Sequence, residues 1–334
     1  MLVRFCGPAG INRRQLSQSA MSTTTARNNL IGIGALCLGA LVFSLQDSAI
    51  KSISGDHAVT LAIFLRAIVS LPILVAMVAF GGGLAQLDTP HWRILVFRGA
   101  VLLCAYTSYF MAFPALPLAE AIALYFMVPL IVTVLSGPLL GEKVSLAAWG
   151  AVALGLIGVF VILRPGYGLF EPAALLSLVS AVTYSYAMIL ARKHGTNVPA
   201  GVMTFYQNAV YLLGALAIAV AMTLFDVQPP GHPSLDFLVR SWAIPNSQDM
   251  ALMAVCGVIA AIGSTLLSHA YRVGEANIVT PFEYTGMIWG VMLGFLLFGE
   301  VPKATTVIGM ALIAIAGVIA LKTGTSNKKP DIGK

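Results

Sequence analysis

Two stretches of this chain share one pattern. Residues 119–145 read AEAIALYFMVPLIVTVLSGPLLGEKVS, and residues 274–302 read GEANIVTPFEYTGMIWGVMLGFLLFGEVP. Each opens with a Glu-Ala pair, continues through an apolar span and ends in Gly-Glu, at Glu142 and again at Glu300. The two endings lie 158 residues apart (300 − 142), about half of the 334-residue chain. The pattern predicts a domain that is present twice, with a binding site between the two copies.

The composition indicates that most of the chain lies within a membrane. Hydrophobic residues make up 58% of the sequence and charged residues only 10%, whereas soluble domains average about 25% charged residues. So few charges cannot cover the surface of a soluble protein of this length. The net charge of +6 does not indicate a nucleic-acid partner, because the basic residues lie mostly in short loops and at the two ends of the chain.

Neither the cysteines nor the motifs indicate an enzyme, a cofactor or a metal site. Cys37, Cys104 and Cys256 fall within apolar stretches, without metal-ligand spacing, and are predicted to be buried small hydrophobic residues. The sequence contains no P-loop, no H-E-x-x-H and no G-x-S-x-G motif. An ATP-driven pump is therefore not expected, and an intramembrane enzyme is a poor alternative.

The apolar stretches predict an all-α membrane protein with ten transmembrane helices, because about 20 apolar residues are needed to cross a bilayer. The expected spans of the first half are Leu30–Ile50, Val59–Phe80, Ile94–Phe113, Ala119–Leu140 and Ala147–Leu163. Those of the second half are Phe170–Ala191, Val202–Phe225, Met250–Ala270, Asn277–Phe298 and Thr305–Leu321. The longest joint, 226–249, is polar and follows the seventh span.

Lys and Arg set the expected orientation, because cytoplasmic loops carry an excess of both. With the N-terminus inside, 13 of the 19 bases are cytoplasmic and two, Arg66 and Arg98, lie within spans. The four outside are Lys51, Arg164, Arg240 and Lys303. We therefore predict a multi-pass protein of the cell inner (plasma) membrane, with both termini cytoplasmic and the joint 226–249 outside.

The ten spans divide into two five-helix repeats, expected at residues 30–164 and 170–321, with cytoplasmic tails at 1–29 and 322–334. Five spans per copy turn the second repeat upside down relative to the first. The first spans of the copies also match weakly, since GALVFSLQDSAIK (39–51) and SAVTYSYAMILAR (180–192) both end in a base. The Arg-rich tail 1–29 resembles a transit peptide in composition but is predicted to be a disordered tail, and Met21 is an alternative start.

Several short motifs together resemble one known family. They are Arg98-Gly99, Pro129 and Gly141-Glu142 in the first half, and Arg272 to Glu275-Ala276, Pro281 to Tyr284 and Gly299-Glu300 in the second. These motifs resemble the drug/metabolite transporter superfamily, specifically its EamA-type ten-helix members. The resemblance implies an inverted-repeat carrier with a central cavity, and a substrate class that varies widely among members.

Four ionisable residues lie deep within the expected spans: Asp47, Arg66, Arg98 and Glu283. A charge at mid-membrane costs about 2.5–3.5 kcal/mol on insertion scales, so each needs a partner or a wet cavity. Their depths allow two pairs, Asp47–Arg66 and Arg98–Glu283. Alternatively, Arg98 extends to the headgroups, and Asp47 faces the outer interface near Lys51.

Proline predicts a break in the fourth span at Pro129 and in the ninth at Pro281, because proline removes a helix hydrogen bond. Broken helices at corresponding places in two repeats point to a binding site. The register between the copies stays open: the Gly-Glu endings place Tyr125 opposite Glu283, and the Glu-Ala openings place Val128 there. Two ordinary kinks without a ligand are the alternative.

Aromatic and amide side chains gather in several spans and suit a flat, weakly charged ligand. The candidate substrate-binding residues are Glu283, Tyr284, Tyr106, Tyr109, Tyr125, Tyr184, Gln207, Asn208 and Trp289. The glycines at 286, 290 and 294 form a face expected to pack between the halves rather than to form a dimer. We expect a monomer or weak homodimer.

The expected function is secondary transport of a small metabolite by alternating access, with the proton as a candidate coupling ion. A heteroaromatic vitamin or metabolite such as riboflavin is the first cargo candidate, and neutral amino acids and their relatives are the second. A passive channel and a membrane sensor are the alternatives of another class.

Overall fold

The computed structural model describes residues 13–164, 171–194, 198–273 and 276–325, and every regular element in these ranges is a helix. The elements of the first half are α1 (Arg13–Ile53), α2 (Val59–Gly82), η1 (Leu84–Leu87), α3 (Trp92–Ala112), α4 (Leu118–Tyr125), α5 (Val128–Leu140) and α6 (Leu146–Leu163). Those of the second half are α7 (Ala173–His194), α8 (Ala200–Leu224), α9 (Pro233–Val239), α10 (Ser247–Val273), α11 (Ala276–Val279), η2 (Thr280–Tyr284), α12 (Thr285–Phe298) and α13 (Ala304–Thr325).

Ten segments are long and apolar enough to cross a membrane, and they match the ten predicted spans to within a few residues. The fourth span consists of α4 and α5, and the ninth of η2 and α12. Large apolar side chains such as Phe160, Leu213 and Leu296 are exposed on these helices, as expected where helices face lipid. The predicted ten-helix, all-α class is confirmed.

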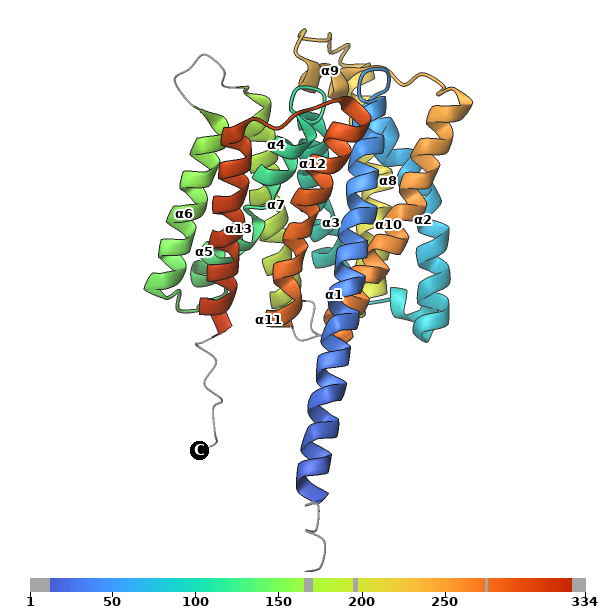
Figure 1. The fold of residues 1–334 in the computed structure, drawn as a ribbon. Coiled ribbons are helices and arrows are strands. Elements are labelled where there is room, and N and C mark those ends of the chain that lie inside the picture. Colours follow the sequence, from blue (N-terminus) through green and yellow to red (C-terminus); the bar gives the residue numbers. More distant parts are fainter. Residues whose placement is uncertain (1–12, 165–170, 195–197, 274–275, 326–334) are drawn as a thin grey trace, which may run out of the picture.

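The helices alternate in direction, so α1 begins and α13 ends at the same end of the bundle (Figure 1). We call this the terminal end; Glu142, just after α5, and Arg192, in the last turn of α7, lie there. The opposite, far end carries Lys51, in the last turn of α1, and Glu300, just after α12. Helix α9, from the joint 226–249, also lies at the far end (Figure 1).

Helix α1 extends well beyond the bundle at the terminal end (Figure 1). It begins at Arg13, so residues 13–29 are helical, whereas the sequence predicted a disordered tail there. Residues 13–29 contain neither Gly nor Pro, so nothing in them interrupts a helix that continues from the apolar span. Residues 1–12 and most of the C-terminal tail lie outside the described residues.

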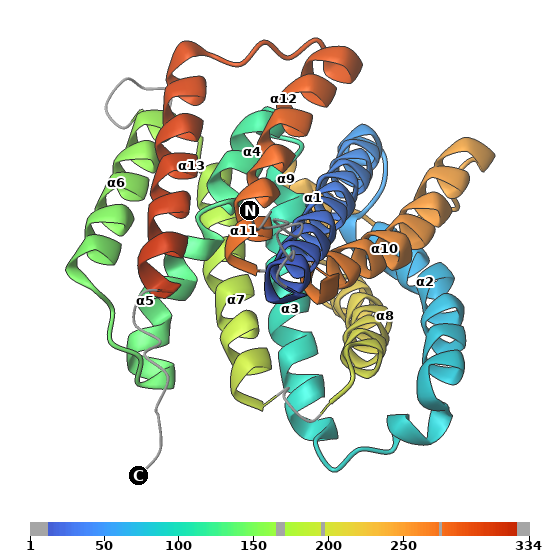
Figure 2. The same cartoon turned by 60° about the horizontal axis from the view of Figure 1, so that its bottom comes forward.

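Helices of the two halves pair across the molecule in a symmetric way. The first span of each half packs against the third of the other, as α1 with α10 and α7 with α3. The two second spans pack together, as α2 with α8, and so do the two fifth spans, as α6 with α13. Figure 2, which brings the terminal end forward, shows α10 next to the central α1, and α6 beside α13 at the left. Exchanging the halves preserves these pairs, as an inverted repeat requires.

The fourth span of each half is broken near a proline, as predicted. In the first half α4 ends at Tyr125 and α5 starts at Val128, with Pro129 in its first turn. In the second half the 3-10 helix η2 separates α11 from α12, with Pro281 in its first turn. Proline fits the first turn of a helix because the amide it lacks would have no partner there.

Both broken spans also end alike. Gly141 and Gly299 adopt the left-handed conformation, with φ of 70° and 65°, which glycine permits without strain. Both glycines allow the following Glu142 and Glu300 to turn away from the helix axis. The repeated Gly-Glu ending therefore has a repeated backbone geometry.

Candidate substrate cavity

A cavity of about 1340 Å³ lies between the halves. Its wall includes Glu142, Lys143 and Arg192, which are exposed at the terminal end. It also includes Asp47 and Tyr109, which are buried. The cavity therefore opens at the terminal end and reaches deep into the bundle.

Four tyrosines form a continuous aromatic wall in this cavity. The ring of Tyr125 lies 4.8 Å from that of Tyr109 and 5.4 Å from that of Tyr184, and Tyr184 lies 6.3 Å from Tyr106, between ring centroids. The four side chains come from α3, α4 and α7, so both halves contribute. The sequence predicted all four as binding residues, and all four line the cavity.

Asp47 provides a carboxylate at the buried part of the cavity wall. Its Oδ2 accepts a 2.9 Å hydrogen bond from the hydroxyl group of Tyr109, and the residue is 9% exposed. Asp47 thus faces the cavity rather than the outer interface. A buried carboxylate requires such a donor, because leaving it without one carries a large desolvation penalty.

Arg66 lies behind the cavity wall and not in it. Its guanidinium carbon is 5.3 Å from the ring centre of Tyr106 and 6.0 Å from that of Tyr211, which are cation–π distances. The residue is 4% exposed, and its Nε and Nη1 have no hydrogen-bond partner among the described residues. Asp47 and Arg66 do not form the expected direct ion pair, because Asp47 turns to Tyr109 while Arg66 lies against the rings.

Arg98 and Glu283 both line the cavity. The Nε of Arg98 donates a 3.2 Å hydrogen bond to the backbone oxygen of Ala187 on α7. Arg98 is buried, so it does not extend to the headgroups. Glu283 reaches the cavity from η2, the broken part of the ninth span.

The remaining predicted residues divide between the cavity wall and the helix contacts. Gln207 lines the cavity, and its Nε2 donates to the hydroxyl group of Tyr211 at 2.9 Å. Asn208 does not, because its Oδ1 accepts a 2.9 Å bond from Ser70 and joins α8 to α2. Tyr284 packs on Phe126, with 5.3 Å between ring centroids, and Trp289 likewise lies outside the wall.

Several polar wall residues carried no distinctive signal in the sequence. They are Gln46, Thr133, Ser136, Ser180 and Thr204. Gln46 is 1% exposed, and its Oε1 has no hydrogen-bond partner among the described residues. Its place next to Asp47 in the chain is the one feature that could have indicated it. An amide oxygen and several hydroxyl groups thus accompany the charges in the wall.

The far end of the cavity is closed by contacts between the halves. Lys51 pairs with the Oε1 of Glu300 and also donates a 2.6 Å hydrogen bond to the backbone oxygen of Leu116. The Oε2 of Glu300 accepts a 2.7 Å bond from the amide of Leu118, the first residue of α4. An anion at a helix N-terminus is favoured by the unpaired amides there.

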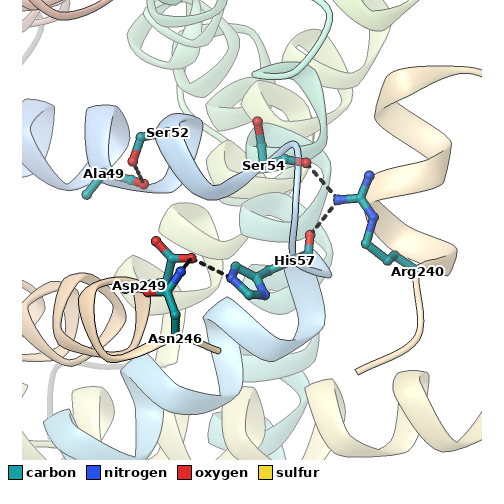
Figure 3. A network of polar contacts seen from close by, with 7 residues as sticks. All are labelled: Ala49, Ser52, Ser54, His57, Arg240, Asn246 and Asp249. Carbon is teal, nitrogen blue, oxygen red and sulfur yellow. Dashed lines mark hydrogen bonds and ion pairs between the residues drawn. The ribbon is translucent and has the colours of Figure 1, made fainter. Parts of the chain in front are cut away.

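A second group of contacts fixes the joint 226–249 to the turn between α1 and α2 (Figure 3). Nη1 of Arg240 donates 3.0 Å hydrogen bonds to the backbone oxygens of Ser54 and His57. Nε2 of His57 lies 2.8 Å from Oδ2 of Asp249, at the start of α10. The sequence indicated only a polar joint here, whereas the structure shows a connection between the halves.

Known proteins resemble this chain along most of its length. A pseudopaline exporter of Pseudomonas aeruginosa is 27% identical over 294 residues, which cover 87% of this chain and 96% of the exporter. A riboflavin transporter of Vibrio cholerae is 30% identical, covering 71% of this chain and 73% of that one. An S-adenosylmethionine uptake transporter of Rickettsia prowazekii is 25% identical, covering 85% and 90%.

The fold and the family model agree with these relatives. One solved crystal structure superposes with a TM-score of 0.59 at 19% identity, covering 91% of this chain and 99% of that one, which shows a shared fold. The model of the EamA-like transporter family matches residues 30–164 and again residues 171–322. The chain is therefore a membrane transporter of small molecules and belongs to the EamA-like transporter family.

Proposed function

We propose that the protein is a secondary transporter that moves a small metabolite across the cell inner membrane by alternating access. The observation that carries this proposal is the cavity between the halves, which is open at the terminal end and closed at the far end by Lys51 and Glu300. A carrier needs one site that faces the two sides of the membrane in turn. An inverted repeat can provide this by exchanging the conformations of its halves.

The distribution of bases supports a cytoplasmic terminal end, and the cavity then faces the cytoplasm. In a cysteine-free variant, a single cysteine at Asn246 should react with an impermeant reagent in intact cells. A single cysteine at Asn327 should stay unlabelled until the membrane is opened. The reverse labelling would contradict the orientation.

The wall chemistry favours a flat heteroaromatic cargo, with riboflavin as the first candidate. The rings of Tyr106, Tyr109, Tyr125 and Tyr184 offer stacking surfaces, and Gln207 offers an amide. The relative from Vibrio cholerae is named for riboflavin, which supports this class.

A second candidate class comprises neutral amino acids and their relatives. Apart from the exposed Glu142, Lys143 and Arg192 at its opening, the cavity is lined by one base, Arg98, and two acids, Asp47 and Glu283. A zwitterion carries one group for each sign of charge, and charge-assisted hydrogen bonds are stronger than neutral ones. Arg98 distinguishes the two classes, because only a cargo with an anionic group needs its charge.

Uptake by proteoliposomes tests both classes. Labelled riboflavin and labelled tryptophan would be offered separately, with and without a proton gradient, to the parent protein and to Arg98→Gln. For riboflavin we expect saturable uptake that Arg98→Gln reduces less than tenfold. Saturable tryptophan uptake that Arg98→Gln abolishes would instead identify the zwitterion class.

Arg93→Gln is the matched control, because Arg93 is exposed on the same helix and lies outside the cavity wall. It should transport like the parent. Uptake of neither compound, nor of other metabolites in a wider panel, would contradict the proposal.

A further inference from the structure

Two ion pairs join the halves at opposite ends of the cavity. At the far end Lys51 pairs with Glu300, and at the terminal end Nη2 of Arg192 lies 2.8 Å from Oε1 of Glu142. In both pairs the base comes from the first span of one half and the acid from the end of the fourth span of the other. Each pair therefore crosses between the repeats.

The acids of the two pairs occupy equivalent positions. Glu142 and Glu300 follow the left-handed glycines that end α5 and α12. The amide of Glu142 donates to the backbone oxygen of Ser136, and that of Glu300 to the backbone oxygen of Gly294, at 3.3 and 3.1 Å. Glu142 and Glu300 are 158 residues apart, and so are Ser136 and Gly294 (294 − 136). The backbone thus confirms the equivalence that the Gly-Glu endings predicted.

The bases are equivalent as well. Lys51 and Arg192 lie in the last turn of α1 and of α7, the first span of each half. They also end the two matching segments of these spans, 39–51 and 180–192. The pair Arg192–Glu142 is therefore the counterpart of Lys51–Glu300 under the inverted repeat.

The two pairs differ in their surroundings. The side chains of Lys51 and Glu300 are 11% and 22% exposed, whereas those of Arg192 and Glu142 are 50% and 46% exposed. Glu300 also accepts the amide of Leu118, at the start of α4. The position equivalent to Leu118 is Ala276, the first residue of α11, by the same 158-residue offset. The far-end pair thus rests on the start of α4, and the start of α11 is the corresponding helix start for the terminal-end pair.

The helix faces beside the two pairs show the same difference. Gly294, near the far end of α12, lies against Leu118. Gly290 and Gly286 follow toward the middle of the bundle and lie against Ile122 and Phe126, which also border the cavity. This face packs the fourth and ninth spans closely, as glycine faces allow.

The equivalent face of α5 carries Val128, Val132 and Ser136, and all three line the open cavity. Thr280 and Glu283 of η2 line it too. The terminal end is therefore open where the far end is packed.

We propose that Glu300 and Glu142, each positioned by its paired base, close the two ends of the cavity in turn by binding the helix start opposite them. When the terminal end closes, the carboxylate of Glu142 binds the amide of Ala276 and the face of α5 packs against η2. When the far end opens, Glu300 releases the amide of Leu118 and α12 separates from α4. This assignment rests on the proposed alternating access and adds the residues that stabilise each of its end states.

The two acids should bias the conformational equilibrium in opposite directions. Glu300 stabilises the state described here, so Glu300→Gln should favour the state that is open at the far end. Glu142 stabilises the other state, so Glu142→Gln should increase the population that is open at the terminal end. Hydrogen bonds to charged groups are strong enough to change such a ratio about tenfold.

Double electron–electron resonance, which measures the distance between two spin labels on the protein in lipid nanodiscs, tests the proposal. One label pair, at Leu146 and Ile278, spans the terminal end, and another, at Gln248 and Val301, spans the far end; all four residues are exposed. Glu300→Gln should shorten the first distance and lengthen the second. Lys51→Gln should also shorten the first distance and lengthen the second. Agreement between the two variants would show that the shifts do not come from a folding defect of one of them. Glu142→Gln should remove the short terminal-end distance.

Glu171→Gln is the matched control. Its acid pairs with His232 within the second half, so the distances should equal those of the parent. If Glu300→Gln and Glu142→Gln changed the label distances in the same direction, the assignment of the two acids would be overturned while alternating access would stand. A single unchanging distance in the parent and every variant, with and without cargo, would overturn alternating access itself.

Discussion

The hydroxyl group of Tyr109 donates a 2.9 Å hydrogen bond to the carboxylate of Asp47 in the wall of the cavity. This contact joins α3 to α1 and provides a buried acid with a donor. Tyr109 also lies 4.8 Å from Tyr125. The bond therefore fixes both the acid and one end of the aromatic wall.

Tyr109→Phe should destabilise the protein by about 1–3 kcal/mol, because it leaves a buried carboxylate without its donor. Thermal unfolding in detergent measures the change. Tyr186→Phe is the matched control, since Tyr186 lies outside this cavity and its hydroxyl group has no hydrogen bond among the described residues. Equal unfolding temperatures for the two variants would show that the bond to Asp47 contributes nothing.

Tyr184→Ala should raise the apparent KM for a heteroaromatic cargo about tenfold, because aromatic stacking contributes about 1–3 kcal/mol per ring. Tyr184→Phe should keep an apparent KM near that of the parent, since the ring remains. Concentration-dependent uptake in proteoliposomes gives both values. An unchanged KM for the Ala variant would indicate that Tyr184 packs against its neighbours and does not bind the cargo.

Gly309→Ala should lower the thermal unfolding temperature, because a Cβ there would lie 2.6 Å from the backbone oxygen of Gly158. A backbone atom cannot move aside without separating α6 from α13. Gly150→Ala on α6 is the control, since nothing lies within 4 Å of its added Cβ. The control should be neutral or slightly stabilising, as alanine favours helices. Equal stabilities of the two variants would contradict this close helix contact.

Glu283→Gln separates two possible roles of the acid on η2. If Glu283 carries the coupling proton, the Gln variant should lose accumulation driven by a proton gradient and keep cargo exchange. If it binds a cationic group of the cargo, exchange should be lost as well. Glu171 lies outside the cavity wall, so Glu171→Gln should keep both gradient-driven accumulation and cargo exchange. Full gradient-driven accumulation by Glu283→Gln at normal protein levels would exclude both roles.

The positions of the spans along the chain, and of their breaks, were readable from the sequence. The apolar spans, the breaks near Pro129 and Pro281 and the repeated Gly-Glu endings each correspond to a feature of the structure. These signals are local: proline and glycine act on their own backbone, and a span is defined by its length.

The rotation of each helix about its axis was not readable. Gln207 and Asn208 are adjacent, and successive residues of a helix point about 100° apart. Only Gln207 lines the cavity, while Asn208 bonds to Ser70. Likewise, Glu283 lines the cavity and the adjacent Tyr284 does not. These helices are apolar on most sides, so no polar stripe indicates which face meets the cavity and which meets another helix. For the same reason depth suggested a direct pair of Asp47 with Arg66, although the two side chains turn to different partners.

Counterflow in proteoliposomes tests the central claim most directly. Vesicles loaded with an excess of the unlabelled panel metabolite that is transported best would be diluted into a trace of the same compound carrying a label. A carrier that presents one site alternately to the two sides should accumulate label transiently above its equilibrium level, and the overshoot should vanish in empty vesicles. Label that enters without an overshoot, at a rate proportional to its concentration, would indicate a channel. Binding without any flux would indicate a sensor, and either result would contradict transport by alternating access.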